Sequence, residues 1–346
     1  MKTPGGKSKK ILIVGAGGIG RKHVDGFLKA GCFSVSICDV DRTKTGKVKK
    51  EYPEIESIFE DFYSTALESF DAILIATPAN FHIPMALQCA ERHVPFLLEK
   101  PLSVTMDGLD KLLNIIEKNN VKCAVGFTRR SIPSYIRLGE LLKEKKVLPK
   151  MAVFTGGGDY RKYRPDYREI YFARKSMGGG CILDSVSHMV DLAQWYLGKP
   201  SDGCCLYDNL VFGDAIETED CAAISARFGE SLVTISNNVF QKPYTTLIEF
   251  TGENANLRYI MDSRTKSCIT YSGDDTGRWD ELACFENEIP DFYVNQAKNF
   301  LNLLEGKNNT ITTVEEAAVN LEFLLNVKAK SKSLTTRANQ RRVRDK

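Results

Sequence analysis

Residues 11–20 read ILIVGAGGIG, and this stretch decides the fold class of the chain. Four apolar residues predict a short buried strand, the glycines predict a tight turn, and the apolar spacing after Gly20 predicts a helix. In such a turn Gly15 supplies the backbone angles, Gly17 lets a pyrophosphate approach the main chain, and Gly20 lets the helix pack on the strand. The free N–H groups at the start of that helix are then expected to face the phosphates of a dinucleotide.

An acidic residue at the end of the second predicted strand, 33–39, supports the same interpretation. Asp39 lies 24 residues after Gly15, where a carboxylate is expected to bind the ribose hydroxyls. A carboxylate there repels a 2′-phosphate and favours NAD, although Arg42 weakens the argument against NADP. The alternative is a structural glycine turn with Asp39 as an ordinary strand-end residue.

Strand and helix patterns alternate through the rest of the first 127 residues. Strands are predicted at 71–77, 95–98 and 122–127, and helices at 81–92 and 106–119. This alternation predicts an α/β fold with a doubly wound parallel sheet in a dinucleotide-binding domain over residues 1–127. Ligands in such sheets lie beyond the carboxyl ends of the strands, which draws attention to segments 77–82, 99–101 and 128–130.

The pattern changes in the second domain, assigned to residues 128–334. Tight turns separate short predicted strands at 151–155, 221–228, 231–239, 245–251, 255–261 and 267–271. They predict an open, mainly antiparallel sheet. Helices are expected at 180–197, 292–304 and 314–330, and the last two have the option of packing back on the first domain. Residues 335–346 form a basic tail.

The helix at 180–197 carries a row of polar and aromatic residues opposite its apolar stripe. At about 100° per residue, Asp184, His188, Asp191 and Trp195 fall on one side. Asp184 and His188 are i, i+4 neighbours, so the carboxylate is placed to orient the imidazole as a general base. The alternative is a surface helix with a solvated Asp–His pair.

Four motifs in this order resemble the glucose–fructose oxidoreductase/inositol dehydrogenase/MocA (Gfo/Idh/MocA) family. They are GAGGIG at 15–20, ATPANFH at 76–82, Glu99-Lys100-Pro101, and Gly179-Gly180 followed by Asp184 and His188. The resemblance extends from Ile11 to about Leu334. It implies an N-terminal Rossmann domain, a C-terminal α/β domain with an open sheet, and NAD(P)-dependent oxidation or reduction of sugars, sugar derivatives or cyclitols.

The resemblance also implies roles for individual residues. Lys100 would polarise the substrate oxygen beside the nicotinamide, His188 would take the hydroxyl proton, and Asp184 would hold the His188 ring; the Lys100–Pro101 bond is often cis in relatives. The expected cofactor-binding residues are Gly15, Ala16, Gly17, Gly18, Ile19, Gly20, Asp39, Arg42, Thr77, Asn80, His82, Glu99 and Lys100. For Asn80 and His82, capping of the following helix is the alternative.

The segment 159–175 interleaves four tyrosines with four arginines and precedes the second glycine-rich turn. In the family this loop borders the substrate, so Tyr163 and Arg164 join Lys100, Asp184 and His188 as expected substrate-binding residues. Tyrosine stacks on sugar rings and arginine binds carboxylate or phosphate, which favours an anionic sugar. A charged surface loop with packed tyrosine rings is the alternative.

The composition indicates a globular protein without nucleic-acid or membrane partners. Of 346 residues, 43% are hydrophobic and 26% charged, and the net charge of +3 comes from basic ends around a mildly acidic body. No apolar run approaches the ~20 residues of a membrane span, and we expect a cytoplasmic protein. Its ten cysteines lack metal-ligand spacing, so no metal site is predicted, and Cys32, Cys38, Cys89, Cys123 and Cys181 are expected to be reduced core thiols. The adjacent Cys204 and Cys205 leave a redox role open.

The favoured function is an NAD(P)-dependent dehydrogenase or reductase acting as a homodimer or homotetramer. One alternative is an NAD-dependent glycoside hydrolase that works by transient oxidation and elimination. The other is a dinucleotide-binding sensor without catalysis, against which the proton-relay residues Lys100, Asp184 and His188 argue. The Arg-rich end after Leu334 has no role that the family suggests.

Overall fold

The structure is a computed structural model that describes residues 8–262, 264–273 and 276–344, with side chains described as far as Ser331 apart from residue 289. The chain forms two compact units. The first contains Met1–Ile132 and Ile289–Ala318, and the second contains Pro133–Glu288 and Val319–Lys346. A segment far along the chain, 289–318, therefore belongs to the same unit as the N-terminal residues.

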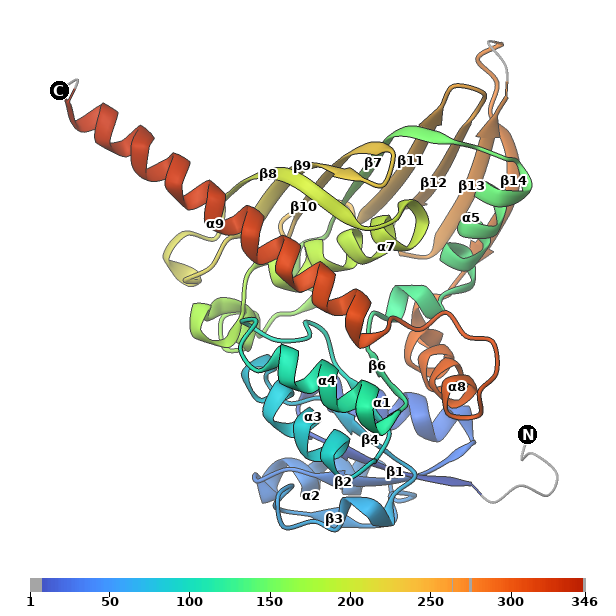
Figure 1. Cartoon of the computed structure of the whole chain (residues 1–346), viewed down its shortest axis with the longest axis vertical. Coiled ribbons are helices and arrows are strands. Elements are labelled where there is room, and N and C mark those ends of the chain that lie inside the picture. The colour runs from blue at the N-terminus through green and yellow to red at the C-terminus, as the bar shows by residue number, and fades with distance from the viewer. Residues whose placement is uncertain (1–7, 263, 274–275, 345–346) are drawn as a thin grey trace. The chain divides into compact units, whose positions relative to one another are not determined.

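The first unit is built on a six-stranded sheet in the order β3-β2-β1-β4-β5-β6, in which every pairing is parallel (Figure 1). The strands are β1 (Lys9–Val14), β2 (Phe33–Cys38), β3 (Ile58–Phe59), β4 (Ala72–Ile75), β5 (Phe96–Leu98) and β6 (Cys123–Val125). The predicted doubly wound parallel sheet is confirmed. Strand β3 was not anticipated because two residues, one of them exposed, leave no apolar run to read.

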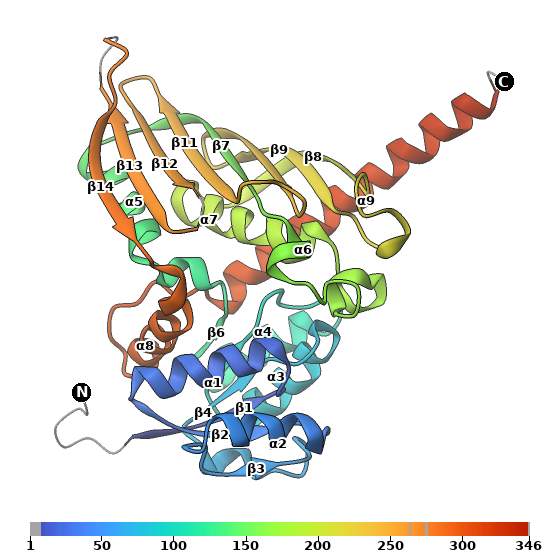
Figure 2. The ribbon, with the colours of Figure 1, turned by 180° about the vertical axis from the view of Figure 1, so that it is seen from behind.

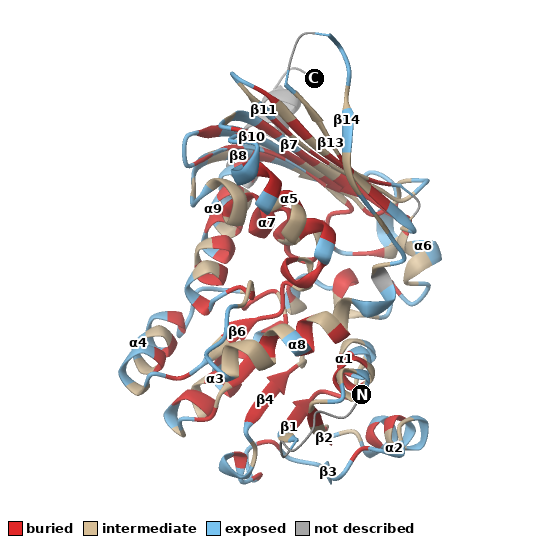
Figure 3. Cartoon of the chain, turned by 90° about the vertical axis from the view of Figure 1, so that its right-hand side faces the viewer, coloured by how far each residue is buried: buried red, intermediate tan, exposed pale blue. Residues whose placement is uncertain are grey.

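The described α-helices of this unit are α1 (Gly18–Ala30), α2 (Arg42–Glu51), α3 (His82–Glu91), α4 (Leu109–Asn119) and α8 (Phe292–Leu304), together with the start of α9 (Val314–Arg344). Short 3-10 turns occur at 67–69, 79–81, 128–131 and 289–291. The core joins apolar side chains of β1 and β2 to Phe27 of α1 and Phe300 of α8. Gly26 permits close contact between these two helices, because a Cβ there would lie 2.5 Å from the Cβ of Tyr293. Figure 3 shows β1 and β4 as buried strands, as expected where both faces of a parallel sheet are covered.

The second unit is built on an eight-stranded sheet in the order β14-β13-β12-β11-β7-β10-β9-β8 (Figure 2). Its strands are β7 (Pro149–Gly157), β8 (Pro200–Asp208), β9 (Cys221–Phe228), β10 (Ser231–Asn238), β11 (Thr245–Gly252), β12 (Asn256–Asp262), β13 (Lys266–Ser272) and β14 (Asp280–Glu286). Among the described strands of this sheet only β7 and β10 pair in parallel, so the predicted mainly antiparallel sheet is confirmed. The two edge strands, β8 and β14, were not predicted. Their residues are largely exposed, so they show no alternation of apolar and polar residues that would mark a strand.

The helices of this unit are α5 (Pro133–Glu144), α6 (Tyr160–Tyr163), a π-helical turn (Ile182–Val186), α7 (Ser187–Leu197) and most of α9 (Val314–Arg344); 3-10 turns occur at 171–173, 175–177 and 213–215. Helices α5 and α7 lie on one face of the sheet (Figure 1). Alternate residues of β9 are buried against that face, and those between them are exposed or half-buried.

The Arg-rich end of the chain is described only in part. The backbone of α9 is helical as far as Arg344, while the side chains of its Arg-rich end and residues 345–346 lie outside the described part. Among the residues with a described position, no helix has the length and hydropathy needed to cross a bilayer.

Candidate active site

The glycine-rich turn is shaped first by the packing of the protein itself. Gly15 has φ of 100°, and a Cβ there would lie 2.6 Å from the carbonyl oxygen of Ala76. A Cβ on Gly20 would lie 1.7 Å from the carbonyl oxygen of Gly15. Both collisions involve backbone atoms, which have little freedom to move. These two glycines are therefore required for the strand, the turn and helix α1 to meet.

Gly17 and Gly18 have a different reason to be glycine. A Cβ added at either would find no heavy atom within 4 Å, so the protein leaves this side of the turn open. Helix α1 begins at Gly18, and Gly17 at its N-cap offers no side chain to the first N–H groups. Open space beside uncapped N–H donors fits a phosphate group. The turn formed by Ala16, Ile19 and the four glycines can therefore hold a phosphate of a dinucleotide.

Asp39 holds this turn in place. Its carboxylate accepts a hydrogen bond from the N–H of Ala16 at 2.7 Å and a second from the N–H of Asp41 at 2.9 Å. The expected contact with ribose hydroxyls stays a prediction. Arg42 is exposed, and its guanidinium donates to the Glu60 carboxylate at 2.5 Å. That pairing partly neutralises the one cation that favoured NADP.

A buried His–Glu pair joins helix α1 to the Glu99-Lys100-Pro101 motif. His23 is fully buried, and its Nε2 lies 2.5 Å from Oε1 of Glu99, which is 7% exposed. The other carboxylate oxygen accepts a hydrogen bond from the backbone N–H of Lys100 at 3.0 Å. Glu99 was expected to line the cofactor, and that role stays a prediction. Its described contacts show that it fixes the backbone from which the Lys100 side chain extends.

His23 was missed in the sequence, although a signal for it was present. Gly20, His23, Val24 and Phe27 share the buried face of α1, so the helical spacing already placed this histidine inside. Within the described structure its Nδ1 has no hydrogen-bond partner, while the ring edge contacts Tyr293 at 4.8 Å between centroids. A proton on Nδ1 would be a buried, unsatisfied donor, so the geometry favours the tautomer in which Nε2–H donates to Glu99.

His82 bridges two loops beside the same motif. Its Nδ1 lies 3.0 Å from the carbonyl oxygen of Pro101 and its Nε2 lies 2.9 Å from that of Thr77. Burial lowers the pKa of His82, so the neutral ring donates from one nitrogen at a time. The alternative that His82 caps helix α3 is wrong, because the N-cap residue is Phe81 and both ring nitrogens of His82 contact these carbonyl groups.

The remaining expected cofactor residues of the first unit lie near these loops. Thr77 is half-buried and its hydroxyl donates to the Met85 sulfur at 3.6 Å. Asn80 is exposed in the 3-10 turn Ala79–Phe81. Lys100 is half-buried, and the Lys100–Pro101 peptide is cis, as the resemblance implied.

The helix of the second unit that carries Asp184 and His188 begins with a π-helical turn, which corrects the projection made from the sequence. Asp184 lies within the turn Ile182–Val186, whereas His188 lies on α7. An i→i+5 turn is wider than an α-helical one, so a rotation of 100° per residue does not hold across it. The alternative of a solvated polar face is also wrong, since Asp184 and Asp191 are 2% and 1% exposed.

Three side chains from the preceding segment surround the Asp184 carboxylate. Tyr160 donates to it at 2.5 Å, Tyr171 donates to its other oxygen, and Arg164 donates at 3.2 Å. Burial, together with this carboxylate, raises the pKa of both tyrosines well above their ordinary value, so both remain donors. The charge of Asp184 likewise raises the pKa of Arg164. The site thus holds a buried carboxylate that accepts hydrogen bonds from three side chains, while its expected role in orienting His188 stays a prediction.

Comparison with known families agrees with both units. Residues 9–127 match the profile described as "Oxidoreductase family, NAD-binding Rossmann fold", and residues 152–258 match the GFO/IDH/MocA C-terminal domain. The chain belongs to the Gfo/Idh/MocA oxidoreductase family. The resemblance inferred from four short motifs is therefore confirmed.

Individual Gfo/Idh/MocA proteins match at low identity. An inositol 2-dehydrogenase of Corynebacterium glutamicum is 26% identical over 196 residues, which cover 56% of this chain and 55% of that protein. The alignment thus spans about half the length of that relative. A myo-inositol 2-dehydrogenase of Thermotoga maritima is 24% identical over 309 residues, covering 84% of this chain and 87% of that protein. An oxidoreductase of Agrobacterium radiobacter solved with NAD+, L-tartaric acid and magnesium shares the fold, with a TM-score of 0.79, 16% identity, and coverage of 94% of this chain and 97% of that one.

The loop that borders the substrate in the Gfo/Idh/MocA family has its arginines already engaged. Arg161 pairs with Asp159 at 2.7 Å, Arg164 with Asp184, Arg168 with the Tyr167 hydroxyl at 3.0 Å, and Arg174 with Glu217 at 2.9 Å. Tyr163 is half-buried, with the Arg264 guanidinium 4.7 Å from its ring centroid. Three of the four arginines thus face carboxylates while Arg168 donates to a neutral hydroxyl, which weakens the argument for an anionic substrate, and that preference stays a prediction.

The cysteines expected in the core are free thiols, although Cys32 and Cys123 are only half-buried. Burial raises the pKa of Cys38 to about 12 and that of Cys89 further, which makes both unreactive. Cys204 is exposed and Cys205 buried, because successive residues of strand β8 point to opposite faces. The redox alternative for this adjacent pair has no support in that arrangement.

Proposed function

We propose that this chain is an NAD-dependent dehydrogenase that acts on a CH–OH carbon of a sugar-type or cyclitol substrate. The observation that carries the proposal is the turn at Gly17 and Gly18, which is open where the rest of the turn is tightly packed. Family membership and the named activities of the inositol dehydrogenases support it. Since Arg161, Arg164 and Arg174 of segment 159–175 are paired with carboxylates, a neutral polyol is favoured over a sugar acid or a nucleotide-linked sugar.

NAD is favoured over NADP by charge. The Asp39 carboxylate is held at the end of β2 by two backbone N–H groups and would repel a 2′-phosphate. Arg42 is paired with Glu60, so it offers little compensation. NAD+ is therefore expected to bind at least about fivefold more tightly than NADP+, since one unfavourable charge contact costs on the order of 1 kcal/mol or more.

The proposed chemistry uses three side chains. Bound nicotinamide supplies the position that accepts or returns the hydride. Lys100 donates a hydrogen bond to the substrate oxygen and stabilises the partial negative charge that develops there, and His188 accepts the hydroxyl proton. Asp184 stabilises the imidazolium that results. In the reductive direction His188 returns the proton to the oxygen.

The test is nicotinamide reduction over a panel of inositols, neutral sugars and sugar acids. Lys100→Ala and His188→Ala are each expected to lower kcat by about 10²- to 10⁴-fold on the best substrate while NAD+ still binds. Two matched controls lie away from the motifs, namely Lys111→Ala and His93→Asn, whose φ of 56° asparagine tolerates. Near-normal turnover by the variant that combines Lys100→Ala and His188→Ala would falsify the proposed roles.

The same assay separates the other two functions. Bound NAD that survives purification, with glycoside cleavage and no net NADH, would indicate a hydrolase that oxidises its substrate transiently. NAD+ binding without turnover of any compound in the panel would indicate a sensor.

We also expect a homodimer or homotetramer, because the sheet face opposite α7 carries exposed apolar side chains. Met151, Leu206 and Leu232 are 56%, 71% and 51% exposed. Light scattering of the purified protein measures the assembly directly.

A further inference from the structure

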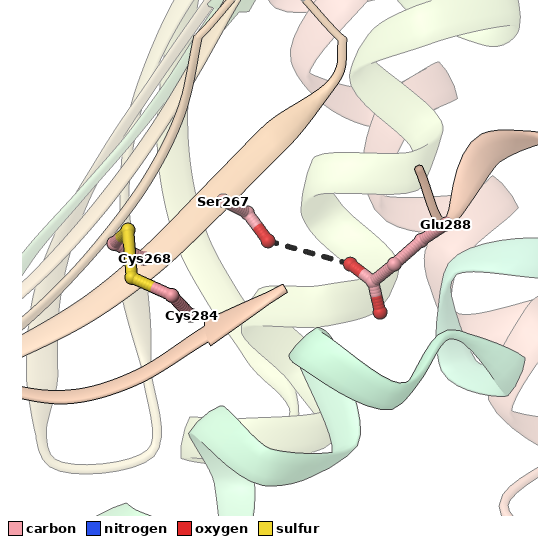
Figure 4. Close-up of a disulfide and its surroundings, with 4 residues drawn as sticks. All are labelled: Ser267, Cys268, Cys284 and Glu288. Atoms are coloured by element: carbon pink, nitrogen blue, oxygen red, sulfur yellow. Dashed lines mark hydrogen bonds between the residues drawn. A yellow bond between two sulfur atoms is a disulfide. The ribbon is translucent and has the colours of Figure 1, made fainter. Parts of the chain in front are cut away.

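Two cysteines at the edge of the eight-stranded sheet form a pair that neither the motifs nor the proposed reaction uses. Cys268 on β13 and Cys284 on β14 are directly opposite in the antiparallel register, with Cα atoms 4.2 Å apart. They form a disulfide in the structure (Figure 4). Strand pairing alone brings two such residues within about 4.5 Å, so the sulfur atoms stay neighbours when the bond is reduced.

A β-bulge brings a carboxylate to the same place. The register shifts after the Ile269–Ala283 pair, so Thr270 faces Glu281 rather than Leu282. Without the shift, Glu281 and Cys284 would point to opposite faces, because they lie three residues apart on one strand. The bulge instead puts Glu281 beside the cysteines, and the three possible ligand atoms lie within 4.8 Å of one another.

The cluster is accessible from solvent. Ile269 is buried on the face that α5 covers, so the neighbouring Cys268 points to the opposite face. Cys268 is half-buried, and Cys284 and Glu281 are exposed. An ion can therefore enter without any movement of a strand.

We propose that Cys268, Cys284 and Glu281 form a redox-gated site for a thiophilic divalent cation such as Zn²⁺. Two thiolates and a carboxylate in one cluster repel one another, and a bound cation converts that repulsion into attraction. Sulfur ligands on a tetrahedral Zn²⁺ lie about 3.8 Å apart, a separation that small side-chain rotations reach from the observed positions. Water completes the coordination.

The gate is the disulfide itself. A dithiol reductant transfers two electrons and two protons to the Cys268–Cys284 bond, which gives two thiols and leaves the reductant as its own disulfide. Zn²⁺ then displaces the two thiol protons and binds both thiolates and the carboxylate of Glu281. In the oxidised form neither sulfur carries the charge that the cation needs, so the site is closed.

The test is metal binding by the full-length protein, reduced and then freed of reductant under anaerobic conditions. The reduced protein is expected to bind one Zn²⁺ per chain at this site, measured by calorimetry, and to give the ultraviolet thiolate absorption when Cd²⁺ is the probe. Cys268→Ser and Cys284→Ser should each abolish this binding, and Glu281→Gln should weaken it by about tenfold or more. Cys204→Ser is the matched control, since Cys204 is a free, exposed strand thiol, and it should change nothing.

Two results would overturn the proposal. One is that the reduced protein binds no more Zn²⁺ than Cys268→Ser, and the other is that oxidised and reduced protein bind equally. Because Glu281→Gln retains both thiols and the strand pairing, its result decides the role of the carboxylate even where a cysteine variant folds poorly. Unchanged affinity in Glu281→Gln would remove Glu281 from the site.

Discussion

Asp39 and Asp184 serve two regions of this protein in different ways. Asp39 binds N–H groups of the backbone within a turn whose shape comes from glycine positions. Asp184 binds the side chains of Tyr160, Arg164 and Tyr171, which come from helix α6, the residue after it and the 3-10 turn at 171–173. A site made of backbone is encoded by a short motif, whereas a site made of side chains depends on how distant segments pack. The predictions below test this contrast. Both tryptophans, Trp195 and Trp279, lie in the second unit, so tryptophan fluorescence follows the unfolding of that unit alone.

The largest expected effect is loss of the Asp184 carboxylate. Asp184→Ala removes the carboxylate that accepts hydrogen bonds from Arg164, Tyr160 and Tyr171, so the second unit should lose about 3–5 kcal/mol of its free energy of unfolding. Urea unfolding followed by tryptophan fluorescence measures this loss. Asp166→Ala, in an exposed part of the same loop, is the control. An Asp184→Ala protein as stable as the control would show that the cluster contributes little.

The next largest effect is expected at Gly20, which packs against the backbone, and should distinguish it from Gly17, which faces open space. Gly20→Ala places a Cβ against the Gly15 carbonyl and should destabilise the first unit by about 3 kcal/mol. Gly17→Ala meets nothing in the protein, so its stability should stay close to wild type while NAD+ binds at least about tenfold more weakly, because the added methyl fills the space proposed for the pyrophosphate. Circular dichroism and NAD+ calorimetry measure the two properties. Equal behaviour of the two variants would contradict the division of roles.

His23→Ala should have an intermediate effect on the first unit. It leaves the buried Glu99 carboxylate without its partner, at a cost of about 2 kcal/mol, and loosens the backbone at Lys100. We expect kcat to fall about tenfold with NAD+ affinity nearly unchanged. His23→Gln keeps an N–H donor at a similar reach and should restore most of the loss in kcat. Failure of this rescue, with both variants folded, would assign His23 to packing alone.

The smallest effect concerns the pH dependence of Asp159. Hydrogen bonds from Arg161 lower the pKa of this buried carboxyl from 3.8 to about 2. Because the folded state holds the lower pKa, the stabilisation is complete above the unfolded value and disappears as the pH falls from about 4 to about 2. Asp159→Asn should therefore lose on the order of 1–2 kcal/mol at neutral pH and match wild type near pH 2. A stability difference that does not change with pH would contradict this origin.

Several features followed from residue order alone. The parallel sheet, the glycine turn and the length of α8 were readable because strand and helix periods, and the need for glycine at close backbone contacts, are local properties. The motif Glu99-Lys100-Pro101 was found in the same way. Its support by His23 was not, although the histidine lay on a buried helical face.

Tertiary packing decided the rest. Contacts between segments determine the π-helical turn at Ile182–Val186, so the helical projection could not be checked from residue spacing. Such contacts also determine the partners of Asp184 and of the loop arginines, so the preference for an anionic substrate could not be checked from spacing either. The bulge that brings Glu281 beside Cys268 and Cys284 has the same origin, because strand register is set by pairing across the sheet. The sequence by itself determined where the backbone bends and which faces are apolar, while only the folded structure decided which distant charged side chains meet, since pairs such as Arg174 with Glu217 join residues far apart in the chain.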